Sequence, residues 1–474
     1  MLKFTEIGAG PPRKRAAAAR SKDGREIYQA FAPAEAGTQA SRCAQCGVPF
    51  CQDACPLQNN IPDWLKLAAE NRLEEAYALS ASTNPMPEVC GRICPQDRLC
   101  EQACVLEQSE HSAVTIGAVE KFLTDTAWER GWVAPIKPGP DRGQSIGIIG
   151  AGPAGLAAAE RMRALGYAVT VYDRHDRVGG LMIYGIPSFK LDKAIMERRT
   201  ARLIAGGISF KLNCNVGDDI SFETLRQQHD AVLIATGVYR PRPLGVDGQQ
   251  VAIAALDYLT ASNKLGLGDA VEAAAPGGQL NASGKRVVVI GGGDTAMDCV
   301  RTAIRQNAES VICLYRRDRA NMPGSLREVA CAEEEGVTFE WLAQPMKLVS
   351  GKATAVEAVR MRLGPADASG RQSPVPVQGS EFVRSADMVI AALGFDPEDL
   401  PALWRTPQLE RRSNGALRVG ATTLATSLPG VFAAGDVVRG ASLVVWALRD
   451  GLDAANSMHA WLSERLSAAS VAAE

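Results

Sequence analysis

Two segments of this chain each combine a short apolar run, a glycine-rich turn and a helical pattern, and they limit the possible folds more than any other feature. The first is SIGIIGAGPAGLAAAERMRALGYAVTVYD, residues 145–173, and the second is KRVVVIGGGDTAMDCVRTAIRQNAESVICLYRR, residues 285–317. Each is expected to form a strand, a tight turn, a helix and a second strand. The sequence therefore predicts two Rossmann-like α/β domains built on parallel sheets.

The glycines allow a tight turn and a close approach of the backbone to a pyrophosphate, whose charge is favoured at a helix N-terminus. The first turn carries them in the pattern GxGxxG, at Gly150, Gly152 and Gly155. The second has the form GxGxxA, with Gly291, Gly293 and Ala296. Both turns are therefore expected to bind dinucleotides.

The end of the second strand distinguishes the two predicted domains. In the first it is Asp173, whose carboxylate can accept hydrogen bonds from a ribose but would repel a 2′-phosphate, which favours FAD or NAD. In the second it is Arg316 and Arg317, and guanidinium groups bind phosphate bidentately, which favours NADP. The alternative is that these arginines are only a solvated strand end.

Two more segments favour a flavin in the first domain. Ala235, Thr236 and Gly237 follow an apolar strand, and the segment GVFAAGD, residues 430–436, ends in Gly435 and Asp436. The expected protein is an oxidoreductase in which FAD takes hydride from NADPH. Because that step needs positioning and no proton transfer by a side chain, no catalytic acid or base is assigned.

Eight of the twelve cysteines form two groups, each with a Cys-Pro. The first reads C-x2-C-x4-C-x3-C-P and the second C-x3-C-P-x4-C-x3-C, and the members are Cys43, Cys46, Cys51, Cys55, Cys90, Cys94, Cys100 and Cys104. Eight thiolates suffice for two [4Fe-4S] clusters. The alternatives are zinc sites, which usually pair two C-x2-C hooks, and disulfides, which a reducing compartment disfavours.

The other cysteines, Cys214, Cys299, Cys313 and Cys331, are solitary and are interpreted as small buried hydrophobes. A disulfide reductase needs a cysteine pair beside its flavin. The electron outlet from the flavin is therefore expected to be the iron-sulfur clusters.

The composition is that of a soluble protein with two or three domains: 474 residues, 46% hydrophobic, 22% charged and a net charge of −2. Nothing in it favours binding to nucleic acid or membranes, and a cytoplasmic location is expected. The basic start of the chain (Arg13, Lys14, Arg15 and Arg20) is expected to be a flexible tail, or alternatively an arm that docks on a partner protein.

The expected organisation is an N-terminal helical iron-sulfur domain followed by two interleaved α/β domains. One helix is predicted from Ile61 over IPDWLKLAAENRLEEAYAL and another over 116–128. The predicted domains are 1–140 for the clusters, 141–265 with 390–474 for FAD, and 266–389 for NADPH, with short alternating strands over 337–392.

These motifs together closely resemble the small (β) subunits of bacterial NADPH-dependent glutamate synthases. The resemblance rests on CAQCGVPFCQDACP, VCGRICPQDRLCEQAC, GAGPAGL, GGGDTAMD, YRRDRANMPG and GVFAAGDVVRGASLVVWALRDG. It implies a glutathione-reductase-like flavoprotein fold and a hetero-oligomer with a large (α) subunit. The large subunit would carry FMN and make L-glutamate from L-glutamine and 2-oxoglutarate with electrons from this chain.

The resemblance also implies binding residues. Those for FAD would be Gly150, Gly152, Pro153, Ala154, Gly155, Asp173, Arg174, Gly180, Leu181, Gly185, Ile186, Lys190, Gly435, Asp436, Leu443 and Val444. Those for NADPH would be Gly291, Gly293, Asp294, Thr295, Ala296, Arg316 and Arg317.

By similarity to the N-terminal part of dihydropyrimidine dehydrogenase, the two cysteine groups would interleave. Cys43, Cys46, Cys51 and Cys104 would hold one cluster, and Cys55, Cys94 and Cys100 would supply three ligands to the other. Its fourth ligand would be either Glu120 or Cys90. Two other interpretations share these motifs: an NADPH:ferredoxin-type or bifurcating subunit with another acceptor, and a zinc-stapled flavoprotein.

Overall fold

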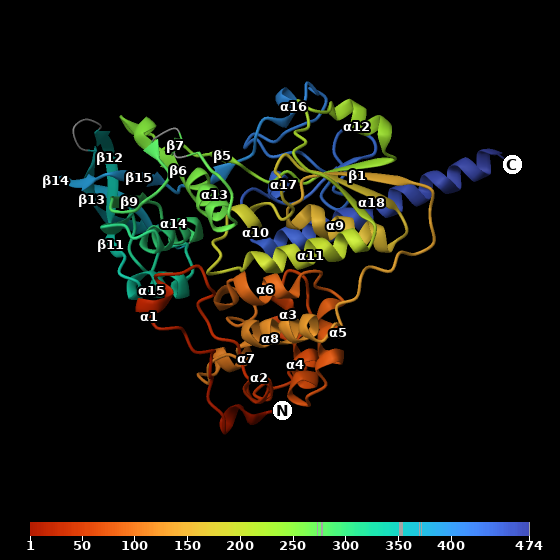
Figure 1. Cartoon of the computed structure of the whole chain (residues 1–474), viewed down its shortest axis with the longest axis horizontal. Helices are drawn as coiled ribbons and strands as arrows, with labels where there is room; N and C mark the ends of the chain where they lie inside the picture. Colours follow the sequence, from red (N-terminus) through yellow and green to blue (C-terminus); the bar gives the residue numbers. More distant parts are fainter. Residues whose placement is uncertain (273, 276–277, 350–353, 369, 371, 474) are drawn as a thin grey trace.

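A computed structural model describes residues 1–473 except 273, 276–277, 350–353, 369 and 371. A helical domain lies on one side of two α/β units, here called the first and second units, and the C-terminal helix projects from the first (Figure 1). This arrangement confirms the expected fold class. Among the described residues, no helix has the length and apolar character needed to cross a membrane.

The helical domain packs around the buried Trp64, whose indole Nε1 donates to Asn59 Oδ1 at 2.7 Å. The helix predicted from Ile61 is divided in two, because Asn71 adopts a left-handed φ of 58° that no helix continues through. The helix predicted over 116–128 is confirmed. The helices of this domain are α2 (Pro33–Ala40), α3 (Phe50–Asp53), α4 (Ile61–Ala69), α5 (Leu73–Ala81), α6 (Pro87–Ile93), α7 (Val105–Gln108) and α8 (Ile116–Glu129), with 3-10 turns η1 (Lys3–Thr5) and η2 (Gln96–Arg98).

The first unit is a parallel sheet in the order β17-β4-β1-β2-β3, with helices on both faces. Its strands are β1 (Ser145–Ile149), β2 (Ala168–Tyr172), β3 (Ile208–Lys211), β4 (Ala231–Ile234) and β17 (Val431–Ala433). Its helices are α9 (Pro153–Ala164), α10 (Leu181–Tyr184), α11 (Lys193–Ala205), α12 (Phe222–Gln228), α16 (Leu400–Leu403), α17 (Asp436–Arg439) and α18 (Val444–Ala473). The unit is discontinuous, because the chain returns to it to pair β17 with β4.

The second unit contains a parallel sheet in the order β11-β10-β9-β15-β6 and an antiparallel sheet β12-β13-β14. Its strands are β6 (Ala252–Ala254), β9 (Arg286–Ile290), β10 (Ser310–Tyr315), β11 (Thr338–Trp341), β12 (Ala343–Val349), β13 (Thr354–Ala366), β14 (Gln372–Ala386) and β15 (Met388–Ala391). Its helices are α13 (Ala255–Gly266), α14 (Asp294–Arg305) and α15 (Leu326–Glu334). The turn η3 (Gln249–Val251) precedes β6, and β7 (Ala274–Ala275) pairs with β8 (Gly278–Gln279).

The sheet of the second unit differs from the expected bounds of 266–389. The strand β6 precedes residue 266 but pairs with β15, and β15 ends at Ala391. The strands β13 and β14 are also longer than the short strands expected here, with 13 and 15 residues. A two-stranded pair of β5 (Arg240–Pro241) and β16 (Phe395–Asp396) lies where the chain passes between the two units.

The start of the chain is not a flexible tail. Residues 13–29 fold back on themselves through backbone hydrogen bonds from Arg15 N to Ile27 O at 2.9 Å and from Gln29 N to Arg13 O at 3.0 Å. The short helix α1 (Ala17–Arg20) at the tip lies beside α15 (Figure 1). This basic segment docks on the chain's own second unit because acidic residues of that unit face it.

A buried ion pair joins the helical domain to the first unit. Arg199 of α11 donates from Nε and Nη2 to the two carboxylate oxygens of Glu88 in α6, at 2.7 and 2.8 Å. The exposed fractions of the two side chains are 2% and 0%. Such a pair has no access to water, so each charge depends on the other.

Arg199→Met is expected to lower the free energy of unfolding by about 3–5 kcal/mol, because it leaves the Glu88 carboxylate buried without its cation. Urea denaturation at neutral pH measures this loss. Arg198→Met is the matched control, because Arg198 pairs with Asp125 at the same interface with 29% of its side chain exposed. The control should lose about 1 kcal/mol or less, and equal losses in both variants would contradict the prediction.

Candidate active site

The first glycine turn connects β1 to α9 and leaves space at the helix N-terminus. Gly150 has a φ of 111°, and a Cβ there would lie 2.3 Å from the carbonyl oxygen of Ala235. A Cβ on Gly155 would lie 2.0 Å from Gly150 O, so this glycine lets α9 pack against the turn. No atom lies within 4 Å of a Cβ on Gly152. The turn is thus closed on its inner side and open in front of the helix.

Asp173 lies at the end of β2, beside this turn. Its carboxylate accepts hydrogen bonds from Ala151 N at 2.7 Å and from His175 N at 2.8 Å. Burial would raise the pKa of Asp173, but these hydrogen bonds and the His175 side chain outweigh it and lower that pKa. The residue therefore presents an ionised acceptor next to the helix N-terminus.

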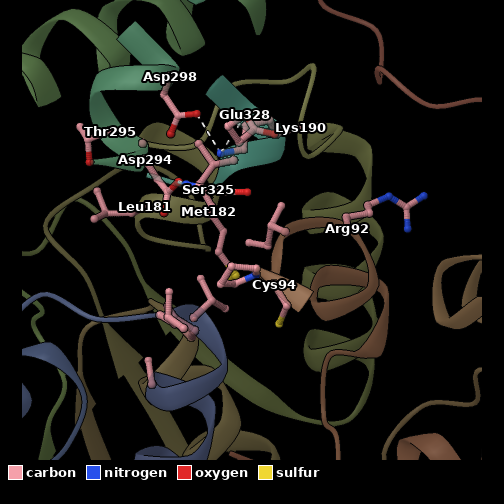
Figure 2. Close-up of a pocket in the computed structure, with 18 of the residues that line it drawn as sticks. Arg92, Cys94, Leu181, Met182, Lys190, Asp294, Thr295, Asp298, Ser325 and Glu328 are labelled. Carbon is pink, nitrogen blue, oxygen red and sulfur yellow. Dashed lines mark hydrogen bonds and ion pairs between the residues drawn. The ribbon is translucent and has the colours of Figure 1, made fainter. Parts of the chain in front are cut away.

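A cavity of about 990 Å³ opens in front of the first turn, between all three parts of the molecule. Most of the predicted binding residues line it: Gly150, Gly152, Pro153, Ala154, Asp173, Gly180, Leu181, Gly185, Ile186, Lys190, Ala235, Thr236, Gly237, Asp294, Thr295, Gly435, Asp436, Leu443 and Val444. Cys94 of the helical domain lines the same cavity (Figure 2). The cavity thus brings segments of both glycine turns together with one of the eight clustered cysteines.

Arg174 lines a second cavity of about 150 Å³ that continues from Gly150 and Asp173. Its guanidinium lies 4.5 Å from the ring centre of Tyr239 and pairs with Glu398 at 3.0 Å. Trp404 also lines this space. A small cavity walled by aromatic rings and a cation suits a flat, polar ring system.

Lys190 reaches from the first unit into the second, inside the larger cavity. Its Nζ donates to Asp298 Oδ1 at 3.0 Å and lies 3.6 Å from Glu328 Oε2, as Figure 2 shows. Burial would lower the pKa of Lys190, but the two carboxylates outweigh it and raise that pKa. Sequence reasoning missed both acids, although Asp298 lies one helical turn after Asp294 in the quoted GGGDTAMD and so shares its face of α14.

The second glycine turn, between β9 and α14, repeats the geometry of the first. Gly291 has a φ of 152°, and a Cβ there would lie 2.3 Å from Ala392 O. Asp294 Oδ1 accepts a hydrogen bond from Ser325 N at 2.9 Å, which ties the start of α14 to the loop before α15. Gly291, Gly293 and Ala296 do not themselves line the cavity.

Arg316 and Arg317 follow β10 and lie outside the larger cavity. Arg316 is exposed, and the Nε of Arg317 is buried without a hydrogen-bond partner among the described residues. Arg319 is different, because it pairs with Glu333 at 2.9 Å. The strand end therefore offers two guanidinium groups for an anion, one of them with an unsatisfied buried N–H.

The eight clustered cysteines separate into two neighbourhoods that do not follow their order in the sequence. The Cys51 sulfur is close enough to Cys43, Cys46 and Cys104 to interact electrostatically with them. The Cys94 sulfur has Cys55, Cys90 and Cys100 as its neighbours instead.

All twelve thiols are free, and the side chains of Cys90 and Cys94 are hydrogen-bond neighbours. None of the twelve cysteines forms a disulfide, and in the described part of the chain no three His, Cys, Asp or Glu side chains converge as they would on one metal ion. A four-iron cluster does not need such convergence, because its four thiolate ligands bind different iron atoms around it.

Glu120 and Cys90 meet at one residue, Asn84. Asn84 donates from Nδ2 to Glu120 Oε1 at 3.2 Å and accepts from Cys90 Sγ at 3.6 Å. Burial raises the pKa of Glu120 to about 8. Both side chains lie within electrostatic reach of Cys55, so the structure leaves either of them available to the second neighbourhood.

Comparisons with known proteins agree with this arrangement. Residues 20–132 match the family model "dihydropyrimidine dehydrogenase domain II, 4Fe-4S cluster", and residues 144–451 match "pyridine nucleotide-disulphide oxidoreductase". The solved structure of Mycobacterium tuberculosis FprA in complex with NADPH matches 70% of this chain and 86% of its own, with a TM-score of 0.56 and 19% identity, which supports the fold alone.

Curated relatives identify the family. The chain is 59% identical to the glutamate synthase [NADPH] small chain of Azospirillum brasilense over 100% of this chain and 99% of that protein. It is 45% identical to the putative oxidoreductase AegA of Escherichia coli over 96% of this chain and 70% of that protein. The identity to the glutamate synthase small chain is higher and covers nearly all of both proteins. The chain therefore belongs to the family of NADPH glutamate synthase small chains.

Proposed function

We propose that this chain oxidises NADPH at a bound FAD and delivers the electrons through two [4Fe-4S] clusters to the large, FMN-carrying subunit of a glutamate synthase. That subunit would use them to make L-glutamate from L-glutamine and 2-oxoglutarate. The observation that carries the proposal is the single cavity lined by both nucleotide-binding units and by Cys94. Bound there, FAD would supply the chemistry that converts a two-electron hydride into single electrons.

The first unit offers a place for each of several parts of the FAD molecule. The open space at Gly152 and the N-terminus of α9 would hold the pyrophosphate, with Pro153 and Ala154 beside it. Asp173 would accept hydrogen bonds from the ribose, and the smaller cavity beside Arg174 would hold the adenine. The 30-residue helix α18 begins at the cavity with Val444, and its N-terminus favours negative charge there.

The second unit would hold NADPH with its pyrophosphate at Gly291, Gly293, Asp294, Thr295 and Ala296. The 2′-phosphate would bind Arg316 and Arg317, which accounts for the unpartnered Nε of Arg317. In this arrangement the residues of the chain bind and orient the two nucleotides, and none of them has to move a proton.

The cysteine neighbourhoods support interleaved ligands. One cluster would be held by Cys43, Cys46, Cys51 and Cys104, and the other by Cys55, Cys94 and Cys100 with either Cys90 or Glu120. Because Cys94 lines the cavity and Cys100 is an electrostatic neighbour of Cys51, the second cluster would lie between the cavity and the first. Electrons would leave in that order.

A second candidate function is the same NADPH oxidation with another electron acceptor. It is favoured by the 45% identity to a putative oxidoreductase, and only the partner distinguishes it from the first.

Purification of this chain together with its large subunit tests the main proposal. NADPH oxidation by the complex is expected to require both glutamine and 2-oxoglutarate and to yield glutamate. Omission of either substrate is the control, and oxidation that continues without both would favour the other acceptor.

Arg316→Ala combined with Arg317→Ala is expected to raise the KM for NADPH by at least about tenfold, because each arginine–phosphate bond contributes about 1.5–3 kcal/mol. The KM for NADH should change by less than about twofold. Arg319→Ala is the matched control, since its guanidinium is already paired with Glu333. Equal increases for both nucleotides would contradict the assignment of the 2′-phosphate site.

Cys90→Ser and Glu120→Ala identify the remaining cluster ligand. Only the variant that removes the true ligand should lose the iron and the EPR signal of one cluster, because three thiolates hold a four-iron cluster incompletely. Iron and sulfide analysis of the purified chain measures this. Cys214→Ser, in the first unit, serves as the control and should keep all of its iron.

A further inference from the structure

The basic segment at the start of the chain forms a strap, defined here as residues 11–28. It leaves the helical domain, extends to the second unit and returns, with α1 at its tip against α15 (Figure 1). Glu26 anchors its base, accepting from Arg92 Nε at 2.6 Å and from Lys121 Nζ at 2.5 Å. Both cations belong to the helical domain, so the strap connects that domain to the second unit.

Arg20 fastens the tip of the strap. Its side chain is 2% exposed and reaches Glu335 Oε1 at 2.8 Å and Glu334 Oε2 at 2.5 Å. Glu335 also accepts from Arg301 and Arg305 of α14, at 2.8 Å each. Burial opposes ionisation of Glu335, but its arginine partners outweigh it and lower its pKa to about 2. Arg20 thereby ties the strap to the end of α15 and, through Glu335, to α14.

All three parts of the molecule meet under the strap. Ile27 of the strap, Phe189 of the first unit and Cys331 of the second unit form one buried apolar cluster. The Arg305 guanidinium lies 3.8 Å from the ring centre of Phe189. The next residue, Lys190, is the one that pairs with Asp298 inside the cavity. A shift of the strap therefore acts directly on the junction between the two nucleotide-binding units.

The strap is also part of the cavity wall, to which it contributes Pro11, Pro12, Arg13, Lys14, Ile27 and Tyr28. Other ties between the helical domain and the second unit include a hydrogen bond from Ser325 Oγ to Asp97 Oδ2 at 3.3 Å. Arg327 pairs with Glu101 at 2.5 Å, but 49% of the arginine side chain is exposed, and such pairs hold position weakly. In the strap, by contrast, the paired side chains of Arg20 and Glu335 are only 2% and 0% exposed.

We propose that the N-terminal strap positions the NADPH-binding unit against the FAD-binding unit and that Arg20 is the positioning residue that fastens it. The proposal rests on the function proposed above. The sheets of the two units do not join, and the chain passes between them beside the two-residue strands β5 and β16. Hydride transfer requires the reacting atoms to lie about 3–3.5 Å apart, so a small rotation of one unit slows the reaction more than it weakens nucleotide binding.

Anaerobic stopped-flow reduction of the bound FAD by NADPH, with the full-length chain carrying its cofactors, tests this role. Arg20→Ala is expected to lower the limiting rate by about tenfold or more while the apparent Kd for NADPH changes by less than about threefold. Arg20→Lys keeps a cation but not the two-pronged contact and should give an intermediate rate. Arg25→Ala, whose side chain is 77% exposed on the same strap, should keep the wild-type rate.

The outcomes separate this proposal from the function on which it rests. A wild-type limiting rate in Arg20→Ala, with flavin and iron content unchanged, overturns the role of the strap. Failure of NADPH to reduce the flavin in the wild-type chain overturns the proposed function instead. If Arg20→Ala does not yield protein with bound cofactors, Arg20→Lys decides alone: a lower limiting rate supports the strap and an unchanged rate overturns it.

Discussion

An ion pair with little exposure to solvent lies at each junction between the three parts of this molecule. Arg199 with Glu88 joins the helical domain to the first unit, Lys190 with Asp298 joins the two α/β units, and Arg20 with Glu335 fastens the strap. A buried charge is costly unless its partner is present in good geometry. Apolar surfaces can slide past one another, whereas these pairs fix a single arrangement, and the shared cavity depends on that arrangement.

The position of Cys94 indicates on which side of the cavity electrons would leave. This residue follows α6, the same helix that carries Glu88, and α6 is held to the first unit by Arg199. The apolar core of the first unit also includes Val89 and Cys90 from this helix and Met86 just before it. The second cysteine neighbourhood is therefore built partly into the interface with the first unit, where Cys90 and Cys94 pack.

Features that depend on a few neighbouring residues could be predicted from the sequence. The glycine turns, Asp173 and the strand ends follow from local spacing, because a tight turn between a strand and a helix leaves few choices of residue. The separation of Cys51 from Cys55 into different neighbourhoods was expected only from the family resemblance, since spacing alone does not assign the eight cysteines to clusters. Asn71, which divides the predicted helix, could not be inferred because the apolar periodicity continues past it.

What was missed depends on contacts between residues far apart in the chain. The strand β6 precedes the second unit's glycine turn but pairs with β15, and nothing local in its three residues indicates that partner. The same holds for Arg20, because a basic N-terminus is usually solvated and only the fold brings Glu334 and Glu335 to it.

In the proposed arrangement, the location of Arg316 and Arg317 outside the larger cavity fits the length of NADPH. The 2′-phosphate is on the adenosine ribose, at the opposite end of the dinucleotide from the nicotinamide. A site that recognises the phosphate must therefore lie away from the place where hydride is transferred. Asp294 and Thr295, between the two ends, do line the cavity. Specificity for NADPH and the transfer of hydride would thus be separated along one nucleotide. The first could then be altered by mutation without touching the cavity wall to which Lys190 and Cys94 belong.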